Sequence, residues 1–117
     1  MDYSTPFLGK IVTVMVDRPI GSRHPKFKDL VYSQNYGYVE GVFAPDGEEL
    51  DAYVLGDFGP LETLEGRCIA IIHRNNDNDD KLVVVPDGTS YTDEQIKSLT
   101  DFQEKFFKSI IIREKYS

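Results

Sequence analysis

The sequence contains no tryptophan, a single cysteine and no long apolar run. One cysteine, Cys68, excludes an internal disulfide and a zinc site built from cysteines. Because it lies within an apolar segment, we expect it to be a small core residue. No stretch approaches the ~18–20 apolar residues that a membrane-spanning helix needs, and the first residues lack the basic and apolar regions of a secretion signal. The sequence therefore predicts a cytoplasmic protein with no membrane partner.

Basic residues are also in the minority. The chain has 13 lysines and arginines against 20 acidic residues, for a net charge of −7. Such a balance argues against a nucleic-acid partner, because nucleic-acid binders present a basic face. It suits a protein that holds cations. The length of 117 residues and the 40% hydrophobic content predict a single domain, residues 1–117, with a real core.

Short segments rich in β-branched residues alternate with turn residues along most of the chain, a pattern that predicts β-strands. The expected strands are residues 10–16, 36–43, 51–55, 66–73 and 81–85. Gly37 and Gly41 fall inside the second strand, where glycine permits a bend or a close approach of backbones.

The pattern changes after Pro86, where a helix is expected. Thr92 and Gln95 fit a capping box at its start. Apolar residues then recur at helical spacing, at Ile96, Leu99, Phe102, Phe106 and Ile110. A second potential cap at Thr100 leaves open one kinked helix or two short ones, with Phe102, Phe106 and Phe107 as the buried stripe. The fold class is therefore mainly β with a C-terminal helix (α+β), a five-stranded OB-like barrel with the helix packed on it.

Carboxylates gather at two places between the expected strands. Asp46 and Glu48 occupy one turn and project to the same side, and Asp51 leads into a core-like strand. The second cluster, residues 77–80, forms another turn, so the two clusters can meet at one end of the barrel. Hard oxygen ligands select Mg²⁺, Ca²⁺ or Mn²⁺, and lysines nearby suit phosphate. Composition alone also permits two ordinary solvated turns.

Three segments in order carry a more specific signal. Residues 32–39 (YSQNYGYV), 46–52 (DGEELDA) and 79–86 (DDKLVVVP) resemble motifs of the soluble (family I) inorganic pyrophosphatases. The resemblance covers roughly residues 11–108. It implies hydrolysis of pyrophosphate to two phosphates by a metal-activated water, several Mg²⁺ ions per active site with Mn²⁺ as the substitute, a small phosphate substrate as partner, and a homo-oligomer.

The resemblance also implies roles for individual residues. Glu48 takes the position of the proton acceptor for the attacking water, and Asp51 that of a ligand bridging two metal ions. The implied metal ligands are Asp17, Asp46, Asp51, Asp77 and Asp79. The implied phosphate ligands are Lys26, Tyr36, Lys81 and Lys108.

The sequence departs from the family pattern at three places. Glu48 stands where the family has aspartate, and Phe107 stands where it has a tyrosine. The segment between Lys26 and Tyr32 is shortened and lacks the hairpin that carries a phosphate-binding arginine, for which Lys28 or Arg23 is the candidate substitute. His24 is a further candidate phosphate contact. Two alternatives stay open: a hydrolase of another phosphoanhydride or phosphate ester, and a non-catalytic module that binds metal or phosphate.

Overall fold

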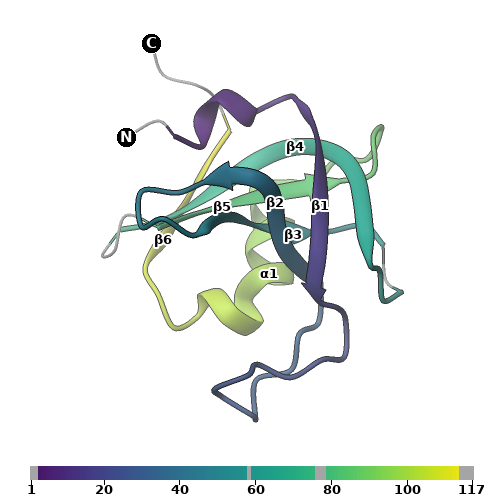
Figure 1. Cartoon of the computed structure of the whole chain (residues 1–117), viewed down its shortest axis with the longest axis vertical. Coiled ribbons are helices and arrows are strands. Elements are labelled where there is room, and N and C mark those ends of the chain that lie inside the picture. Colours follow the sequence, from purple (N-terminus) through teal and green to yellow (C-terminus); the bar gives the residue numbers. More distant parts are fainter. Residues whose placement is uncertain (1–2, 58, 76–78, 114–117) are drawn as a thin grey trace.

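The computed structural model describes residues 3–57, 59–75 and 79–113. Within them, six strands and one α-helix follow a short 3₁₀-helix (Figure 1). In chain order the elements are η1 (Thr5–Phe7), β1 (Ile11–Arg18), β2 (Asn35–Phe43), β3 (Glu49–Val54), β4 (Thr63–Arg74), β5 (Asp79–Val85), α1 (Asp93–Glu104) and β6 (Ser109–Ile112). The described helix is too short and too polar to cross a membrane.

Strands β1 to β5 close into a barrel, as the sequence predicts. The neighbours run in the order β1-β2-β3-β5-β4, and β4 pairs back onto β1. All these pairs are antiparallel except β3 with β5, which run parallel. Closure leaves few unpaired strand edges, so most backbone groups of the barrel are satisfied within the sheet.

Glycines in β2 have the roles expected of them. A Cβ at Gly37 would lie only 1.9 Å from the carbonyl oxygen of Met15, so glycine is required where β1 and β2 approach. Gly41 has φ +81°, a conformation that side-chain-bearing residues rarely adopt, and it lies next to the irregular end of the β2–β3 pairing.

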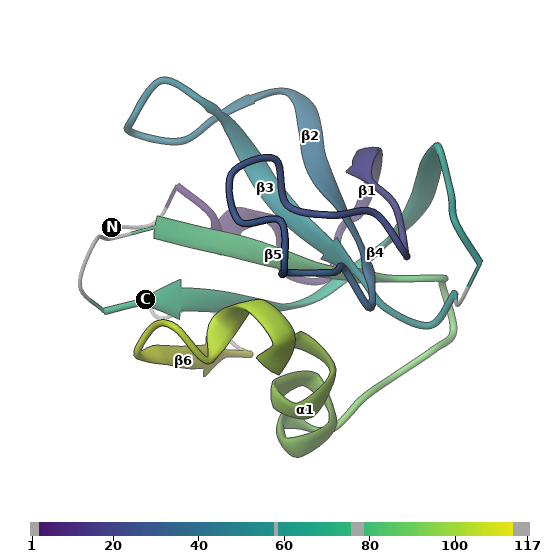
Figure 2. The ribbon, with the colours of Figure 1, turned by 90° about the horizontal axis from the view of Figure 1, so that it is seen from below.

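Alternate residues of the central strands enter two apolar layers. Leu82 and Val84 point into the barrel, where they pack with Cys68, Ala52 and other small residues. Val83 and Val85 point outward, into a layer that the helix covers. Figure 2 shows α1 and β6 lying together against one side of the barrel. The period-two alternation of strands thus places a second face of β3, β4 and β5 opposite the helix.

Helix α1 begins as predicted. The Thr92 hydroxyl accepts a hydrogen bond from the backbone N–H of Gln95, and the Gln95 side chain accepts one from the N–H of Thr92. Ile96 is fully buried and Leu99 packs in the same layer. The capping box and the first two turns of the apolar stripe are therefore confirmed.

The predicted end of the helix is wrong. A single helix stops at Glu104, and Thr100 caps no second one, because its hydroxyl donates to the Ile96 carbonyl within α1. Phe106 is 65% exposed rather than buried. Ile110 belongs to β6, which pairs with the edge of β4. The three consecutive isoleucines of β6 favour a strand, and the open edge of β4 supplies the hydrogen-bond partners that make one.

Candidate functional site

The outer face of β3, β4 and β5 changes from apolar to charged toward one end of the barrel. Asp51 shares the face of Tyr53, since the two are separated by one residue, and Lys81 and Asp79 share the face of Val83. Arg74 follows Ile72 on β4 in the same way. Because Asp51 pairs with Lys81 and Arg74 pairs with Asp79 in the sheet, these four side chains meet.

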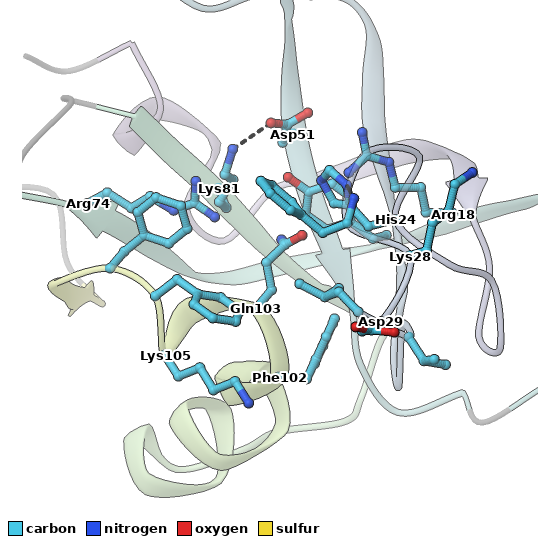
Figure 3. Close-up of a pocket in the computed structure, with 16 residues that line it drawn as sticks. Arg18, His24, Lys28, Asp29, Asp51, Arg74, Lys81, Phe102, Gln103 and Lys105 are labelled. Atoms are coloured by element: carbon cyan, nitrogen blue, oxygen red, sulfur yellow. Dashed lines mark hydrogen bonds and ion pairs between the residues drawn. The ribbon is translucent and has the colours of Figure 1, made fainter.

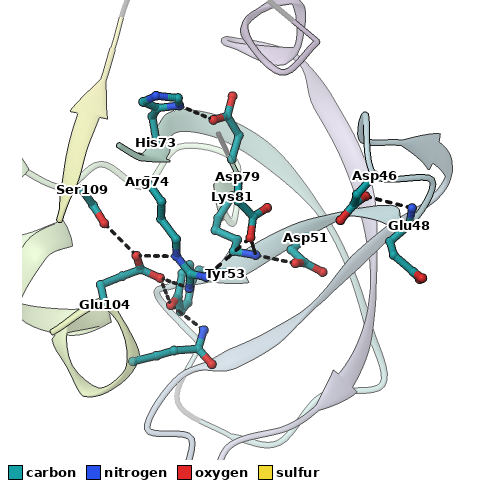
Figure 4. Close-up of polar contacts among 12 residues, drawn as sticks. Asp46, Glu48, Asp51, Tyr53, His73, Arg74, Asp79, Lys81, Glu104 and Ser109 are labelled. Carbon is teal, nitrogen blue, oxygen red and sulfur yellow. Dashed lines mark hydrogen bonds and ion pairs between the residues drawn. The ribbon is translucent and has the colours of Figure 1, made fainter. Parts of the chain in front are cut away.

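Lys81 lies between two carboxylates (Figure 4). Its Nζ is 2.6 Å from Asp51 Oδ2 and 2.9 Å from Asp79 Oδ2. The lysine side chain is only 4% exposed, whereas Asp51 and Asp79 are 37% and 29% exposed. A buried ammonium needs such partners to offset its desolvation. The two aspartates keep oxygens accessible from solvent, as expected for a site at the barrel rim.

A buried network joins this cluster to the helix. Arg74 donates from Nε and Nη2 to the two oxygens of Glu104, at 3.1 and 2.7 Å. Nη1 of the same guanidinium lies 3.5 Å from Asp79. Glu104 also accepts hydrogen bonds from the hydroxyls of Tyr53 and Ser109. The last residue of α1 thus fixes the orientation of an arginine that faces the carboxylates.

A second arginine is held by the continuation of this network. The Gln103 amide donates to Tyr53 and accepts from the hydroxyl of Tyr32. Tyr32 in turn accepts a hydrogen bond from Arg18, whose guanidinium also lies 5.6 Å from the ring centre of Tyr36. Arg18 and Arg74 are therefore positioned by one chain of hydrogen bonds, with Tyr53 and Gln103 at its centre.

Both arginines line a cavity of about 1000 Å³ (Figure 3). Asp51, Lys81 and Tyr36 also line it, so its inner end is the charged cluster just described. One wall is the loop between β1 and β2, and the other is the end of α1 with residues 105–107. Asp79 itself does not line the cavity, but it adjoins the inner end through its contact with Lys81. The site therefore combines the accessible carboxylate of Asp51 with three cations in one concave place and a second carboxylate beside it, a composition suited to an anion accompanied by metal ions.

Ionisation of two further residues is perturbed at this end of the barrel. Burial raises the pKa of Tyr36 well above its ordinary value, and the negative charge of Asp51 raises it further, so the phenol stays protonated as a donor. Partial burial raises the pKa of Asp17; Arg18 opposes the shift and Asp51 adds to it. Asp17 thus lies within electrostatic reach of Asp51.

Asp46 and Glu48 lie apart from the central cluster, in the turn between β2 and β3 (Figure 4). Both side chains are exposed. The Asp46 carboxylate accepts a hydrogen bond from the backbone N–H of Glu48 at 2.9 Å. Neither residue lines the cavity. Their assignments as metal ligand and proton acceptor stay predictions, and Asp77 falls outside the described residues.

The second acidic cluster is not simply a turn, in contrast to the prediction, because Asp79 and Asp80 already belong to β5. Asp80 points away from the site and pairs with His73 at 2.6 Å. Alternation along the strand separates the two aspartates, leaving only Asp79 on the outer face with Lys81.

The predicted lysines divide into two groups. Lys81 lies at the centre of the site, whereas Lys26 and Lys108 are exposed and do not line the cavity. Lys28, a proposed substitute for the missing arginine, does line it. Arg23, the other proposed substitute, instead donates to the carbonyl of Lys28 at 2.8 Å.

His24 also lines the cavity. Its Nδ1 accepts hydrogen bonds from the backbone N–H groups of Lys26 and Phe27, at 3.0 and 3.1 Å. It therefore holds the loop in shape and keeps only Nε2 for other contacts.

Arg18, Arg74 and Glu104 were missed by the sequence reasoning. Arg18 follows Asp17, an implied metal ligand, but the resemblance assigned Arg18 no role of its own. Arg74 directly follows the predicted strand 66–73, and its place beside an acidic cluster was a usable signal. Glu104 carried none, since an acidic residue at the end of a helix is usually solvated.

The donor set fits a magnesium ion. In the described part of the chain, no three acidic, histidine or cysteine side chains converge closely enough to enclose a metal. Mg²⁺, however, is commonly bound through one or two carboxylates, with water and substrate phosphate completing its shell. Asp51 and Asp79 can provide that pair of carboxylates on adjoining strands.

Comparison with known proteins gives a consistent result. The family described as inorganic pyrophosphatase matches residues 10–112. An inorganic pyrophosphatase of Neisseria meningitidis serogroup B is 28% identical, over 87% of this chain and 68% of that protein. One from Saccharolobus solfataricus is 29% identical, over 67% of this chain but only 46% of its own length.

Solved structures share the fold. An inorganic pyrophosphatase from Neisseria gonorrhoeae superposes with a TM-score of 0.59 at 25% identity, covering 80% of this chain and 72% of that one. One from Helicobacter pylori gives a TM-score of 0.64 at 18% identity, covering 90% and 85%. The barrel with its C-terminal helix is therefore the architecture of these proteins.

Proposed function

Because this chain belongs to the inorganic pyrophosphatase family, we propose that it hydrolyses inorganic pyrophosphate to two phosphates in a Mg²⁺-dependent reaction. The observation that carries the proposal is the cluster of Asp51, Lys81 and Asp79, of which Asp51 and Lys81 line the inner end of a cavity that two arginines also line. Carboxylates supply metal ligands there, and the cations supply contacts for phosphoryl oxygens.

Asp51 and Asp79 are the proposed primary metal ligands. The negative charge of Asp51 contributes to the raised pKa of Asp17, which is the proposed third metal ligand. Asp46 and Asp77 are proposed to complete the set, so that several Mg²⁺ ions are held and Mn²⁺ can replace them. When bound, Mg²⁺ polarises the phosphoryl oxygens and lowers the pKa of the attacking water.

Binding of Mg²⁺ has a consequence for Lys81. In the present arrangement the Lys81 ammonium is the nearest positive charge to Asp51 and Asp79, at 2.6 and 2.9 Å. Asp51 and Asp79 would hold a divalent ion through their accessible oxygens, and that ion would compete with Lys81 for the two carboxylates. The Lys81 ammonium would then be available to a phosphoryl oxygen, which would give this side chain a role in coupling metal and substrate binding.

The remaining groups are proposed to orient the two phosphoryl groups. Arg18 and Arg74 present planar guanidinium groups that can bind phosphate through two hydrogen bonds, which a lysine cannot do. The Tyr36 hydroxyl donates a further hydrogen bond. Lys26 and Lys108 are proposed as outer phosphate contacts that act when their exposed side chains extend toward the bound anion.

Glu48 is the proposed proton acceptor. As water attacks one phosphorus atom, the bond from that atom to the bridging oxygen breaks, and the bridging oxygen leaves with the second phosphate. The proton released by the water passes to the Glu48 carboxylate. This step requires the turn that contains Asp46 and Glu48 to lie closer to Asp51 with substrate bound than without it.

Release of phosphate from pyrophosphate tests the proposal directly. We expect rapid release with Mg²⁺ near pH 8, no release after chelation, and restoration by Mn²⁺. Absence of release in protein shown to bind Mg²⁺ would instead favour a non-catalytic binding module. A cytoplasmic location and assembly into a homo-oligomer are further parts of the proposal, and sedimentation of the purified protein tests the second.

A further inference from the structure

The cavity is larger than pyrophosphate requires. Its volume is about 1000 Å³, near the upper end of the range of about 300–1,000 Å³ that holds drug-sized ligands. The polar and charged groups proposed to bind the metal ions and the two phosphoryl groups gather at the inner end: Arg18, Tyr36, Asp51, Arg74 and Lys81. The rest of the cavity extends from them between the β1–β2 loop and the end of α1 (Figure 3).

Aromatic rings line this outer part from both sides. Phe27 comes from the loop, and Phe106 and Phe107 come from the segment after α1. They are 59%, 65% and 39% exposed, although burial of an aromatic ring normally stabilises a protein. Three exposed rings that face one cavity from two segments distant in the sequence form a surface suited to a flat ligand group.

Charged side chains line the outer part of the cavity together with the aromatic rings. Lys28 and Lys105 add positive charge to the outer walls, and the exposed carboxylate of Asp29 is a hydrogen-bond acceptor between them. The Arg74 guanidinium stacks on the Phe107 ring at 3.7 Å, which places an aromatic face directly beside the inner, phosphate-binding end. A ligand that suits these walls is anionic at one end, aromatic at the other, and carries hydroxyl or amino donors between.

We propose that the cavity binds a nucleoside diphosphate, with its diphosphate at the inner end and its base between Phe27 and Phe106. The proposal rests on the proposed function for the diphosphate end and adds a substrate class to it. Base–aromatic stacking tolerates any base, so discrimination among bases is expected to be weak. The Asp29 carboxylate is placed to accept from the ribose hydroxyls.

Two matched probes separate the organic group from the diphosphate. α,β-Methylene-ADP and methylenediphosphonate carry the same non-hydrolysable P–C–P unit, and only the first has a nucleoside. Calorimetric titration of each into the Mg²⁺-loaded protein should show about tenfold tighter binding of α,β-methylene-ADP, the contribution expected from one stacked base. Equal or weaker binding of that probe would overturn the proposal.

Alanine variants test whether particular aromatic rings cause the tighter binding of α,β-methylene-ADP. Phe106→Ala and Phe27→Ala should each lower the affinity ratio of the two probes from about tenfold toward one. Phe43→Ala is the matched control, because Phe43 is 61% exposed on β2 and does not line the cavity. It should leave the ratio unchanged. If Phe106→Ala changed the sedimentation behaviour but not the ratio, the aromatic surface would be an interface between copies of this chain, and the proposal would be wrong.

Failure of this inference is distinguishable from failure of the proposed function. If the protein hydrolysed pyrophosphate but showed no preference for α,β-methylene-ADP, the proposed pyrophosphatase activity would stand and the proposed nucleotide binding would be wrong. If the protein bound α,β-methylene-ADP tightly but released no phosphate from pyrophosphate, the proposed nucleotide binding would stand and the proposed activity would be wrong.

Discussion

Glu104 at the end of α1 offers a sharp test of how the site is held together. Its two oxygens accept hydrogen bonds from Arg74, Tyr53 and Ser109, at distances between 2.6 and 3.1 Å. Glu104 and Arg74 are only 8% and 7% exposed. Substitution Glu104→Ala removes the carboxylate and leaves the buried Arg74 guanidinium, among the described residues, with the more distant Asp79 as its one ion-pair partner.

The expected loss is large because the remaining charge is not solvated. Removal of one partner of a buried ion pair costs about 3–5 kcal/mol in the free energy of unfolding. For a domain of this size, 1 kcal/mol lowers Tm by roughly 4 °C, so a decrease of about 12–20 °C is expected. Glu104→Gln keeps one side-chain oxygen as a hydrogen-bond acceptor and the shape of the side chain, but it removes the negative charge. It should lower the free energy of unfolding by less than Glu104→Ala does.

Equilibrium unfolding in urea measures these differences. Glu65→Ala is the control, since Glu65 is an exposed acidic residue of β4, and surface substitutions usually stay within about 0.5 kcal/mol. A loss below about 1 kcal/mol for Glu104→Ala would refute the reasoning, because it would mean that Arg74 reaches solvent when its partner is gone.

The same pair makes stability depend on pH. Burial by itself raises the pKa of Glu104, but hydrogen bonds from Arg74 and Tyr53 outweigh it, and the net pKa lies below the ordinary value of 4.5. A lowered carboxyl pKa stabilises the fold at pH values above 4.5, and this contribution is lost as the pH falls through the folded-state value. Unfolding of the wild type should therefore become easier below pH 4.5, and Glu104→Gln should lack this part of the pH dependence.

Three other substitutions test separate parts of the account. Asp51→Asn should abolish phosphate release and weaken Mg²⁺ binding in calorimetry, and turnover at the wild-type rate would contradict its role as a metal ligand. Arg18→Met should raise KM for pyrophosphate about tenfold or more with a smaller effect on Tm, because it removes a phosphate contact from the cavity wall; an unchanged KM would count against that contact. Thr92→Ala should lower the free energy of unfolding by about 1 kcal/mol without affecting KM, since it removes the hydrogen bond to Gln95 at the start of α1; a cost near zero would show that the cap does not contribute.

Much of the fold was predictable because local patterns report it. The run of β-branched residues within 81–85, bounded by turn residues, identified a buried strand, and the pairing of Thr92 with Gln95 located the start of the helix. The end of the helix was not predictable in this way. Phe106 and Ile110 continue the helical spacing of Ile96, but pairing of β6 with the edge of β4 competes for the same segment and wins.

The candidate site shows the same division. Asp51, Asp79 and Lys81 were found from their motifs, and alternation along β3 and β5 is sufficient to put them on one face. Arg18 and Arg74 were not found, because the partners that orient their guanidinium groups lie on distant segments of the chain. One chain of hydrogen bonds runs from Arg18 through Tyr32 and Gln103 to Glu104, with partners up to 71 residues apart in sequence.

The sequence by itself determined the family, the location of most strands along the chain and the carboxylate motifs, because these depend on residue type and spacing over short distances. Tertiary structure alone decided where α1 ends, which of the cations face the cavity, and that Asp80 turns away from Asp79 toward His73. These outcomes depend on which strand edges and buried partners are available in space. Hydrogen bonds and ion pairs between distant segments outweigh local preference there, since a buried polar group without a partner costs more than a helix turn contributes.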